Sequence, residues 1–287
     1  MIQGEQVWDA HIHLFPERLF AAIWGWFDRF GWDIPFAGWD LDSYLSFLQD
    51  MGVDRGFLLP YCHKPGMAMD LNRWVRSVAL ANPWLIPFAS VHPEDEEIAD
   101  TLALCLDSWG FAGLKLQLAV IKYPADHPAL VPACREVYQR DKILILHAGT
   151  APYAPGQEEY KALGLRRVLP VLEAFPGLKL IIPHFGLDEL GLMQEILEAY
   201  PKVCVDTSWA LANPKLEVPE SELAGFMLAH RDRILFGTDF PILEHSPRDM
   251  LSALNRLVPD AETRRLILHA NAQRLVAGSD AVGSQPG

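Results

Sequence analysis

The sequence predicts a single (β/α)8 barrel of the TIM type, an α/β fold, and three observations favour that fold class. The chain has 287 residues, half of them hydrophobic, and one such barrel commonly needs about 250 residues. Short apolar runs alternate with longer amphipathic stretches, which is typical of parallel strands joined by helical crossovers. Eight runs of this kind occur, whereas an open doubly wound sheet usually has about six.

The candidate strands share a short, β-rich apolar character. They lie at residues 6–14, 55–61, 86–91, 113–118, 143–147, 179–184, 203–206 and 234–238. Stretches with helical patterns lie between and after them, at residues 41–51, 70–81, 94–109, 128–141, 164–175, 187–200, 221–230, 247–257 and 261–276. Several strands, such as 143–147, are nearly continuous apolar runs, as expected for parallel strands that helices cover.

A single barrel domain over residues 1–277 is the simpler organisation, because no linker or break in composition divides the chain. The remaining segment, 278–287, is rich in Gly and Ser, and we expect it to be disordered.

Composition narrows the range of partners. The net charge of −13, without a run of Lys or Arg, argues against a nucleic-acid partner. No apolar stretch reaches the roughly 20 residues of a membrane span, and the N-terminus lacks the features of a signal peptide. Four scattered cysteines without a CxxC pair are typical of reduced, buried thiols. We therefore expect a cytoplasmic protein that acts on a small molecule.

An unusually aromatic segment follows the first strand. Eight aromatic residues occur within 20 positions, namely Phe20, Trp24, Trp26, Phe27, Phe30, Trp32, Phe36 and Trp39. They fall in the first β→α connection, which is far longer than the usual ~2–6 residues. The rings either pack on the barrel or on a second subunit, or they face the catalytic mouth; we expect at least one to face it. The segment also makes a homodimer plausible.

Polar residues gather at the ends of the predicted strands. The strand-end residues able to bind a metal or move a proton are His11, His13, Lys115, His147, His184 and Asp239. Active sites of these barrels are built at the carboxyl ends of the strands, so these side chains are expected to converge.

The spacing of His11 and His13 carries the metal hypothesis. Residues two apart on a strand point the same way, so both imidazoles face one point, with Asp9 on the same side and one step deeper. A pair of histidines alone is weak evidence. Buried imidazoles and carboxylates at several strand ends, however, cost stability unless they are paired or bound to metal. Nitrogen and oxygen ligands suit Zn²⁺ and also permit Mn²⁺, Fe²⁺ or Co²⁺.

Five motifs resemble those of the amidohydrolase superfamily. They are Asp9-Ala10-His11-Ile12-His13, residues 110–116 (GFAGLKL), 183–186 (PHFG), 236–241 (FGTDFP) and 271–275 (NAQRL). More narrowly they resemble its "amidohydrolase 2" branch, which includes 2-amino-3-carboxymuconate-6-semialdehyde decarboxylase. The likeness runs from the first strand to about Leu275.

The resemblance implies a role for each strand-end residue. His11, His13, His147 and Asp239 would hold one divalent metal, Zn²⁺ before Mn²⁺, Fe²⁺ or Co²⁺, with His184 beside it as acid or base. Lys115 would contact a substrate anion as an ammonium. In two-metal relatives the equivalent lysine is instead carboxylated and bridges both ions.

Three functions remain open on these residues. The first is a metal-dependent hydrolase of a small, possibly cyclic or aromatic, molecule, in which Asp239 protonates the leaving group. The second is a nonoxidative decarboxylase of an unsaturated or aromatic carboxylate, which uses the same residues. The third is a non-catalytic binding barrel, which is disfavoured because every expected ligand is present.

Further residues follow other strands and are weaker candidates. His63, His92 and Trp209, together with Tyr153 and Tyr160, are expected near the mouth as possible substrate contacts. The remaining histidines, His127, His230 and His269, fall on helices or connections, where packing or surface roles are expected.

Overall fold

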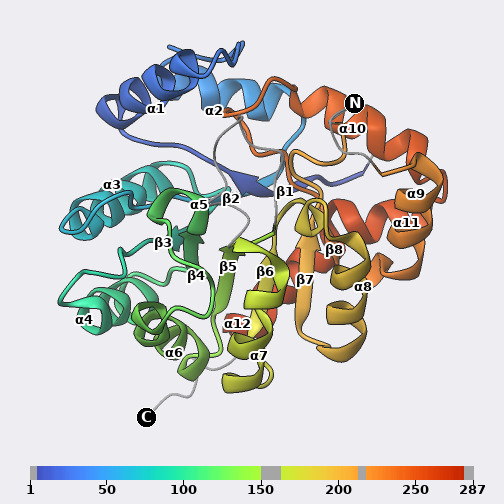
Figure 1. Cartoon of the computed structure of the whole chain (residues 1–287). Coiled ribbons are helices and arrows are strands. Elements are labelled where there is room, and N and C mark those ends of the chain that lie inside the picture. The colour runs from blue at the N-terminus through green and yellow to red at the C-terminus, as the bar shows by residue number, and fades with distance from the viewer. Residues whose placement is uncertain (1–4, 150–162, 213–217, 281–287) are drawn as a thin grey trace.

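A computed structural model describes residues 5–149, 163–212 and 218–280. Within them, eight parallel strands stand in chain order around a barrel, alternating with helices on the outside (Figure 1). The strands are β1 Trp8–Ile12, β2 Arg55–Leu58, β3 Leu85–Ala89, β4 Gly113–Gln117, β5 Ile143–His147, β6 Lys179–Ile182, β7 Val203–Asp206 and β8 Ile234–Leu235. The predicted (β/α)8 fold class is confirmed.

The barrel closes between its first and last strands through backbone hydrogen bonds beyond β8. The amide of Ala10 donates to the carbonyl of Phe236 over 2.7 Å. Further along, the amide of Asp239 donates to the carbonyl of His11, and the amide of His13 to that of Phe240, each over 2.8 Å. The segment after β8 is therefore held beside the end of β1.

The helices are shorter and more numerous than predicted. They are α1 Glu17–Arg29, α2 Leu41–Asp50, α3 Ala68–Ala81, α4 Ile98–Ala103, α5 Leu118–Ile121, α6 Val131–Gln139, α7 Leu169–Ala174, α8 Leu190–Ala199, α9 Glu220–Ala229, α10 Pro247–Leu257, α11 Ala261–Arg265 and α12 Asn271–Asp280. The predicted helix at 94–109 begins only at Ile98 and passes into a π-helical turn, Leu104–Ser108. A second π-helical turn, Leu266–Ala270, lies between α11 and α12.

Several strands end before their predicted boundaries. The ladder of β1 ends at Ile12 after a register shift, and that of β6 ends at Ile182. His13, His184 and Asp239 therefore lie just past strand ends. The apolar character of these segments predicted their burial correctly but not their strand ends. The chain stays buried at the barrel mouth after the hydrogen-bonded ladder has ended.

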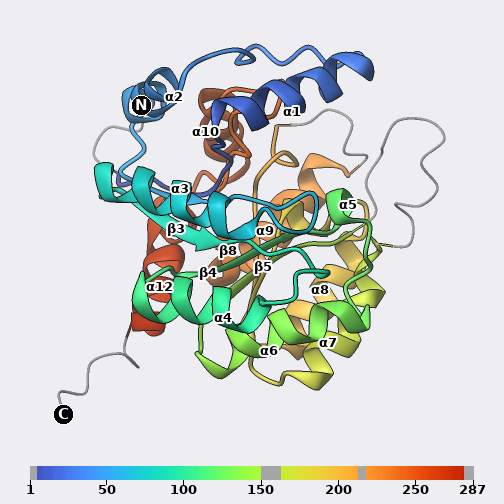
Figure 2. The ribbon, with the colours of Figure 1, turned by 90° about the vertical axis from the view of Figure 1, so that its left-hand side faces the viewer.

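The last helix closes the end of the barrel opposite the mouth. Figure 2 shows α12 at one end of the strands and α5 at the other. Nζ of Lys179, at the start of β6, donates to Oδ2 of Asp141 over 2.7 Å and to the carbonyl of Gly278 over 2.8 Å. The helix continues to Asp280, so three residues of the expected tail are helical, and residues 281–287 lie outside the described chain.

The aromatic connection after β1 folds as helix α1 and the loop leading to α2. Both helices lie on the same side of the barrel as α10 (Figures 1 and 2). Phe20, Trp24 and Phe36 are buried, and the ring of Phe36 packs on Phe240 with centroids 4.9 Å apart. The segment is thereby anchored next to the loop that carries Asp239.

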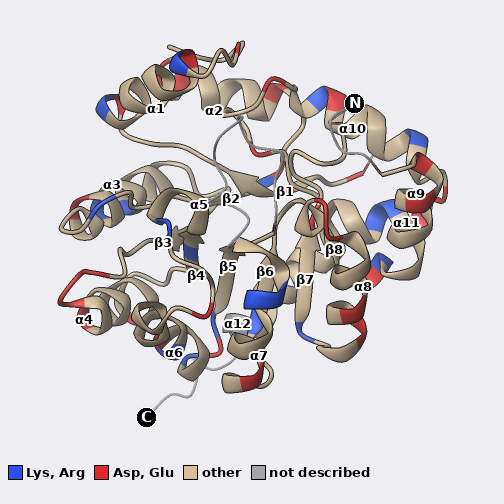
Figure 3. Ribbon diagram, viewed as in Figure 1, with Lys and Arg blue, Asp and Glu red and all other residues tan. Residues whose placement is uncertain are grey.

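The outer surface mixes both signs of charge. In Figure 3, Lys and Arg alternate with Asp and Glu over the outer helices. All four cysteines are buried and unbridged, as expected for reduced thiols. Among the described residues, no helix combines the length and the apolar character needed to span a membrane.

Candidate metal centre and pocket

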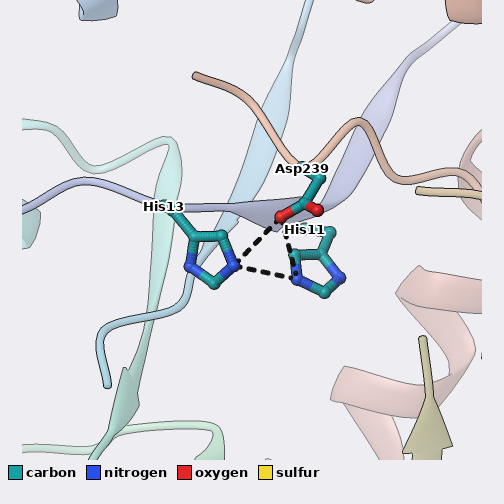
Figure 4. Close-up of side chains that lie close together, drawn as sticks. All are labelled: His11, His13 and Asp239. Atoms are coloured by element: carbon teal, nitrogen blue, oxygen red, sulfur yellow. Dashed lines mark hydrogen bonds and ion pairs between the residues drawn. The ribbon is translucent and has the colours of Figure 1, made fainter. Parts of the chain in front are cut away.

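Three side chains, from the first strand and from the segments that follow the first and last strands, converge at the mouth of the barrel (Figure 4). Nε2 of His13 lies 3.1 Å from Oδ1 of Asp239, and Nε2 of His11 lies 3.5 Å from the same oxygen. The two Nε2 atoms are 3.1 Å apart. The three residues are buried, and their ligand atoms lie within 4.8 Å of one another.

Hydrogen bonds on the far side of each imidazole settle which nitrogen carries the proton. Nδ1 of His13 lies 2.6 Å from the carbonyl oxygen of Leu59, which can only accept. Nδ1 of His11 lies 2.8 Å from Oδ2 of Asp206. Both Nδ1 atoms therefore carry the proton, and both Nε2 atoms present a lone pair.

The centre consequently brings three electron-pair donors together. Oδ1 of Asp239 is buried and has no hydrogen-bond partner among the described residues. Two imidazole lone pairs and a carboxylate oxygen repel one another unless a cation lies between them. The donor set therefore fits a divalent ion such as Zn²⁺ or Mn²⁺.

Burial and mutual charge set the protonation of these groups. Burial, together with Lys115 nearby, holds the pKa of His11 well below its usual value, which favours the neutral, ligating form. Burial alone would raise the pKa of Asp239, but His11, His13 and His184 lower it to about 2. The carboxylate is therefore ionised.

His147 and His184 lie beside this group. Their ring centroids are 5.0 Å apart, and His184 is 5.4 Å from the ring of His11. Nδ1 of His147 is buried without a hydrogen-bond partner in the described chain. Burial lowers the pKa of both imidazoles, so both are neutral near pH 7. His147 does not belong to the three-residue cluster, but its orphaned nitrogen fits a role as a fourth ligand.

Lys115 lies beneath the centre. Its side chain is fully buried, and Nζ is 3.3 Å from Nε2 of His11. Burial lowers the pKa of Lys115 to about 8, while Asp239 and Asp206 oppose that shift. Like His11 and His13, Lys115 is not among the residues that line the cavity above this group.

A cavity of about 480 Å³ opens over these residues. His147, His184 and Asp239 contribute to its lining, which is otherwise mostly apolar. Helix α1 and the loop after it contribute Trp26, Phe27 and Trp32. The expectation that at least one ring of the aromatic segment faces the site is thus met by three.

The weaker candidates fall on both sides of the cavity boundary. His63 and Trp209 line the cavity. His92 lies outside it, and its Nδ1 accepts a hydrogen bond from the amide of Glu94. The two candidate tyrosines, Tyr153 and Tyr160, lie outside the described residues.

Five non-glycine residues that line the cavity have positive φ angles. The angles are 62° at Lys122, 60° at His184, 61° at Leu187, 55° at Trp209 and 63° at Asp239. Such conformations cost about 1–3 kcal/mol at a non-glycine residue and persist where surrounding contacts impose them. They cluster here at residues that face the cavity.

Sequence reasoning missed Asp206, the last residue of β7, and Ser208, which follows that strand. Both are fully buried, and both contact the histidines of the centre. The sequence does carry a signal for Asp206, because this residue ends an apolar run as the other strand-end candidates do. Tyr61 was also missed; its ring lines the cavity and lies 5.2 Å from that of His13.

The fold and the site define a barrel protein with a candidate divalent-metal centre at its mouth. The profile of the amidohydrolase family matches residues 8–277, nearly the whole chain. The chain therefore belongs to the amidohydrolase family of enzymes. No curated protein sequence gives a significant match.

Solved structures with the same fold include decarboxylases and a hydrolase. A 2,6-dihydroxybenzoate decarboxylase from Rhizobium has a TM-score of 0.66 at 18% identity, covering 96% of this chain and 99% of that one. A 5-carboxyvanillate decarboxylase from Novosphingobium aromaticivorans, complexed with manganese and 4-hydroxy-3-methoxy-5-nitrobenzoic acid, has a TM-score of 0.70 at 16% identity, covering 96% and 97%. A probable 2-pyrone-4,6-dicarboxylic acid hydrolase from Acinetobacter baumannii, with citric acid bound, has a TM-score of 0.65 at 18% identity, covering 95% and 99%.

Proposed function

We propose that the chain is a divalent-metal-dependent hydrolase of a small cyclic or aromatic molecule. The observation that carries the proposal is the convergence of His11 Nε2, His13 Nε2 and Asp239 Oδ1 next to the cavity, which Asp239 helps to line. We propose a single ion, with His147 as a fourth ligand and Zn²⁺ or Mn²⁺ as the metal. The buried, unbridged cysteines suit a cytoplasmic location.

The protein side chains supply the proton transfers. Bound at this centre, a divalent ion would polarise a carbonyl group and lower the pKa of a coordinated water toward about 7. His184 is neutral, and because its Nδ1 faces the carbonyl of Ser208, Nε2 remains to accept a proton. Asp239 also borders the cavity and can return a proton to a leaving group.

The cavity limits the substrate. Its volume of about 480 Å³ suits one small molecule, and its apolar walls exclude water from the reacting atoms. Aromatic rings from the α1 region offer flat faces against which a planar substrate can stack. A cyclic ester, cyclic amide or aromatic compound fits these conditions.

A second candidate is nonoxidative decarboxylation of an unsaturated or aromatic carboxylate. The mostly apolar lining favours it, because loss of CO2 from a carboxylate is easier where the charge is poorly solvated. In this reaction Nε2 of His184 would first take up a proton, from the carboxyl group of the substrate or from solvent, and would then deliver it to the carbon that loses CO2. Decarboxylases among the structures with this fold give the alternative further support.

A substrate screen with two separate readouts tests both reactions. Metal-loaded enzyme is incubated with lactones, amides, esters and aromatic carboxylates in ¹⁸O-labelled water. Hydrolysis adds one labelled oxygen to a product, whereas decarboxylation releases CO2 and leaves the product unlabelled. Turnover in either class should be lost in Asp239→Asn. If neither reaction occurs while ligands still bind, the chain is a non-catalytic binding barrel and the proposal is wrong.

A further inference from the structure

The carboxylate of Asp206 joins three segments of the barrel mouth. Oδ2 accepts a hydrogen bond from Nδ1 of His11, at the end of β1, over 2.8 Å. Oδ1 accepts from the backbone amide of His184 over 3.2 Å and from that of Ser208 over 3.0 Å. The carboxylate therefore contacts a candidate metal ligand and the backbone of the candidate proton acceptor together.

The hydroxyl of Ser208 completes this arrangement. It donates to Oδ1 of Asp206, so its oxygen can only accept from other groups. That oxygen lies 2.9 Å from Nδ1 of His184 and 3.1 Å from Nδ1 of His11, and the carbonyl of Ser208 lies 2.8 Å from Nδ1 of His184. Both histidines are therefore protonated at Nδ1.

We propose that Asp206, acting with Ser208, is a positioning residue that couples the metal centre to His184. One carboxylate fixes the tautomer of His11, which frees Nε2 for the metal, and holds His184 so that its Nε2 is the proton acceptor. The proposal rests on the metal-dependent function proposed above. It assigns the residues at the end of β7 a role in assembling the site rather than in touching substrate.

Burial makes this role hard to replace. Asp206 and Ser208 are fully buried, so water cannot substitute for the carboxylate oxygens. The hydrogen bond from the backbone amide of His184 to Asp206 also restrains His184, whose φ of 60° is unfavourable for a residue with a side chain. Without Asp206, the orientation of His184 loses a restraint at the same time as His11 loses its proton acceptor.

Substitution of Asp206 by asparagine isolates the effect of the second acceptor oxygen. The new amide has nearly the same shape but only one acceptor oxygen. If its NH2 group faces His11, Nδ1 must become an acceptor and the proton moves to Nε2, where it blocks the metal. If the NH2 group faces the other way, it meets the backbone amides of His184 and Ser208, which also donate.

The test compares Asp206→Asn and Ser208→Ala with the control Thr207→Val. Thr207 lies between the two residues and is equally buried, but its hydroxyl bonds the backbone of Gly237 rather than a histidine. The first measurement is the Kd for Mn²⁺. Loss of such a supporting hydrogen bond typically weakens metal binding by about 10–100-fold, and we expect this for Asp206→Asn, with Thr207→Val within about threefold of wild type.

The second measurement uses metal-free protein and records the ring ¹⁵N resonances of the histidines. Asp206→Asn should shift those of His11 and His184, whereas the Nδ1 resonance of His13, held by the carbonyl of Leu59, should stay unchanged. Ser208→Ala removes only the shared hydroxyl and should shift the same two residues. This milder variant keeps the test decisive if Asp206→Asn does not fold.

Two results would overturn the coupling. One is an Mn²⁺ affinity of folded Asp206→Asn equal to that of Thr207→Val. The other is unchanged His11 and His184 resonances in Ser208→Ala. If wild type itself binds no Mn²⁺, the proposed metal function fails instead, and the resonances of the metal-free proteins still decide whether Asp206 and Ser208 position the two histidines.

Discussion

His13 Nε2 and Asp239 Oδ1 lie 3.1 Å apart, although one residue follows the first strand and the other follows the last. The backbone bonds that close the barrel, from His13 to Phe240 and from Asp239 to His11, also bring these two ligands together. Closure of the fold and assembly of the centre are thus the same structural event.

Metal binding should therefore stabilise the folded chain. An ion that binds only the native state adds about 2.7 kcal/mol at 100 times its Kd, which raises the melting temperature by several degrees. Thermal unfolding in excess Mn²⁺ and in EDTA measures the difference, and His13→Ala should abolish it. Equal melting temperatures for wild type under both conditions would speak against the centre.

A substitution at Lys115 tests whether the centre binds one metal ion or two. Its position 3.3 Å from His11 Nε2, outside the cavity lining, leads us to expect a supporting group rather than a bridging ligand. Lys115→Met should therefore retain close to one metal per chain by elemental analysis. A fall from two ions to one or none, with a carboxylated lysine in wild type by mass spectrometry, would show a two-metal centre instead.

Trp26 and Phe30 form a matched pair for testing the aromatic roof of the cavity, a name that we give to the lining residues Trp26, Phe27 and Trp32. They are similarly exposed, at 41% and 38%, and their ring centroids lie 4.7 Å apart, but only Trp26 lines the cavity. Once a substrate is known, Trp26→Ala should raise KM about tenfold, since stacking of such rings contributes about 0.5–1.5 kcal/mol beyond the burial of their area. Phe30→Ala should leave KM nearly unchanged. Equal effects of the two variants would mean that the roof does not contact substrate.

Gly113 tests the packing that positions Lys115 and His147. A Cβ atom at Gly113 would overlap the carbonyl oxygen of Ile143 on the paired strand β5. Gly113→Ala should lower the free energy of unfolding by at least about 2 kcal/mol, measured by chemical denaturation. The control is Gly191→Ala in α8, where no atom lies within 4 Å of a new Cβ, and which should change stability by less than about 1 kcal/mol. Similar stabilities for both variants would contradict the close approach of β4 and β5.

The sequence predicted the features that depend on repetition and on strand ends. Alternation of apolar and amphipathic runs predicted the barrel, because burial on both faces leaves a strong mark in each strand. The strand-end position of His11, His13 and Asp239 predicted that their side chains converge, and the structure brings them together. The parity argument placed Asp9 on the same side as the histidines; its carboxylate is buried but accepts hydrogen bonds from Thr238 instead.

Features that depend on contacts between distant segments escaped prediction. Asp206 is recognisable as a positioning residue only when β1, β6 and β7 are seen side by side, because its partner His11 lies on β1 and its partner His184 follows β6. The three aromatic rings at the cavity could not be told apart from the buried ones, since all eight occur in one short segment without a clear period. Strand ends were also missed where burial continues past the ladder, as at His13.

The most direct test is the metal content of wild type, His13→Ala and Asp239→Ala, purified in parallel and measured by elemental analysis after dialysis against Zn²⁺ or Mn²⁺. The site geometry predicts about one ion per chain in wild type and a loss of most of it in each variant, because each removes one of three converging donors. His63→Ala, which alters only the cavity wall, should keep the ion. Retention of one ion per chain by folded His13→Ala and Asp239→Ala would contradict the assignment.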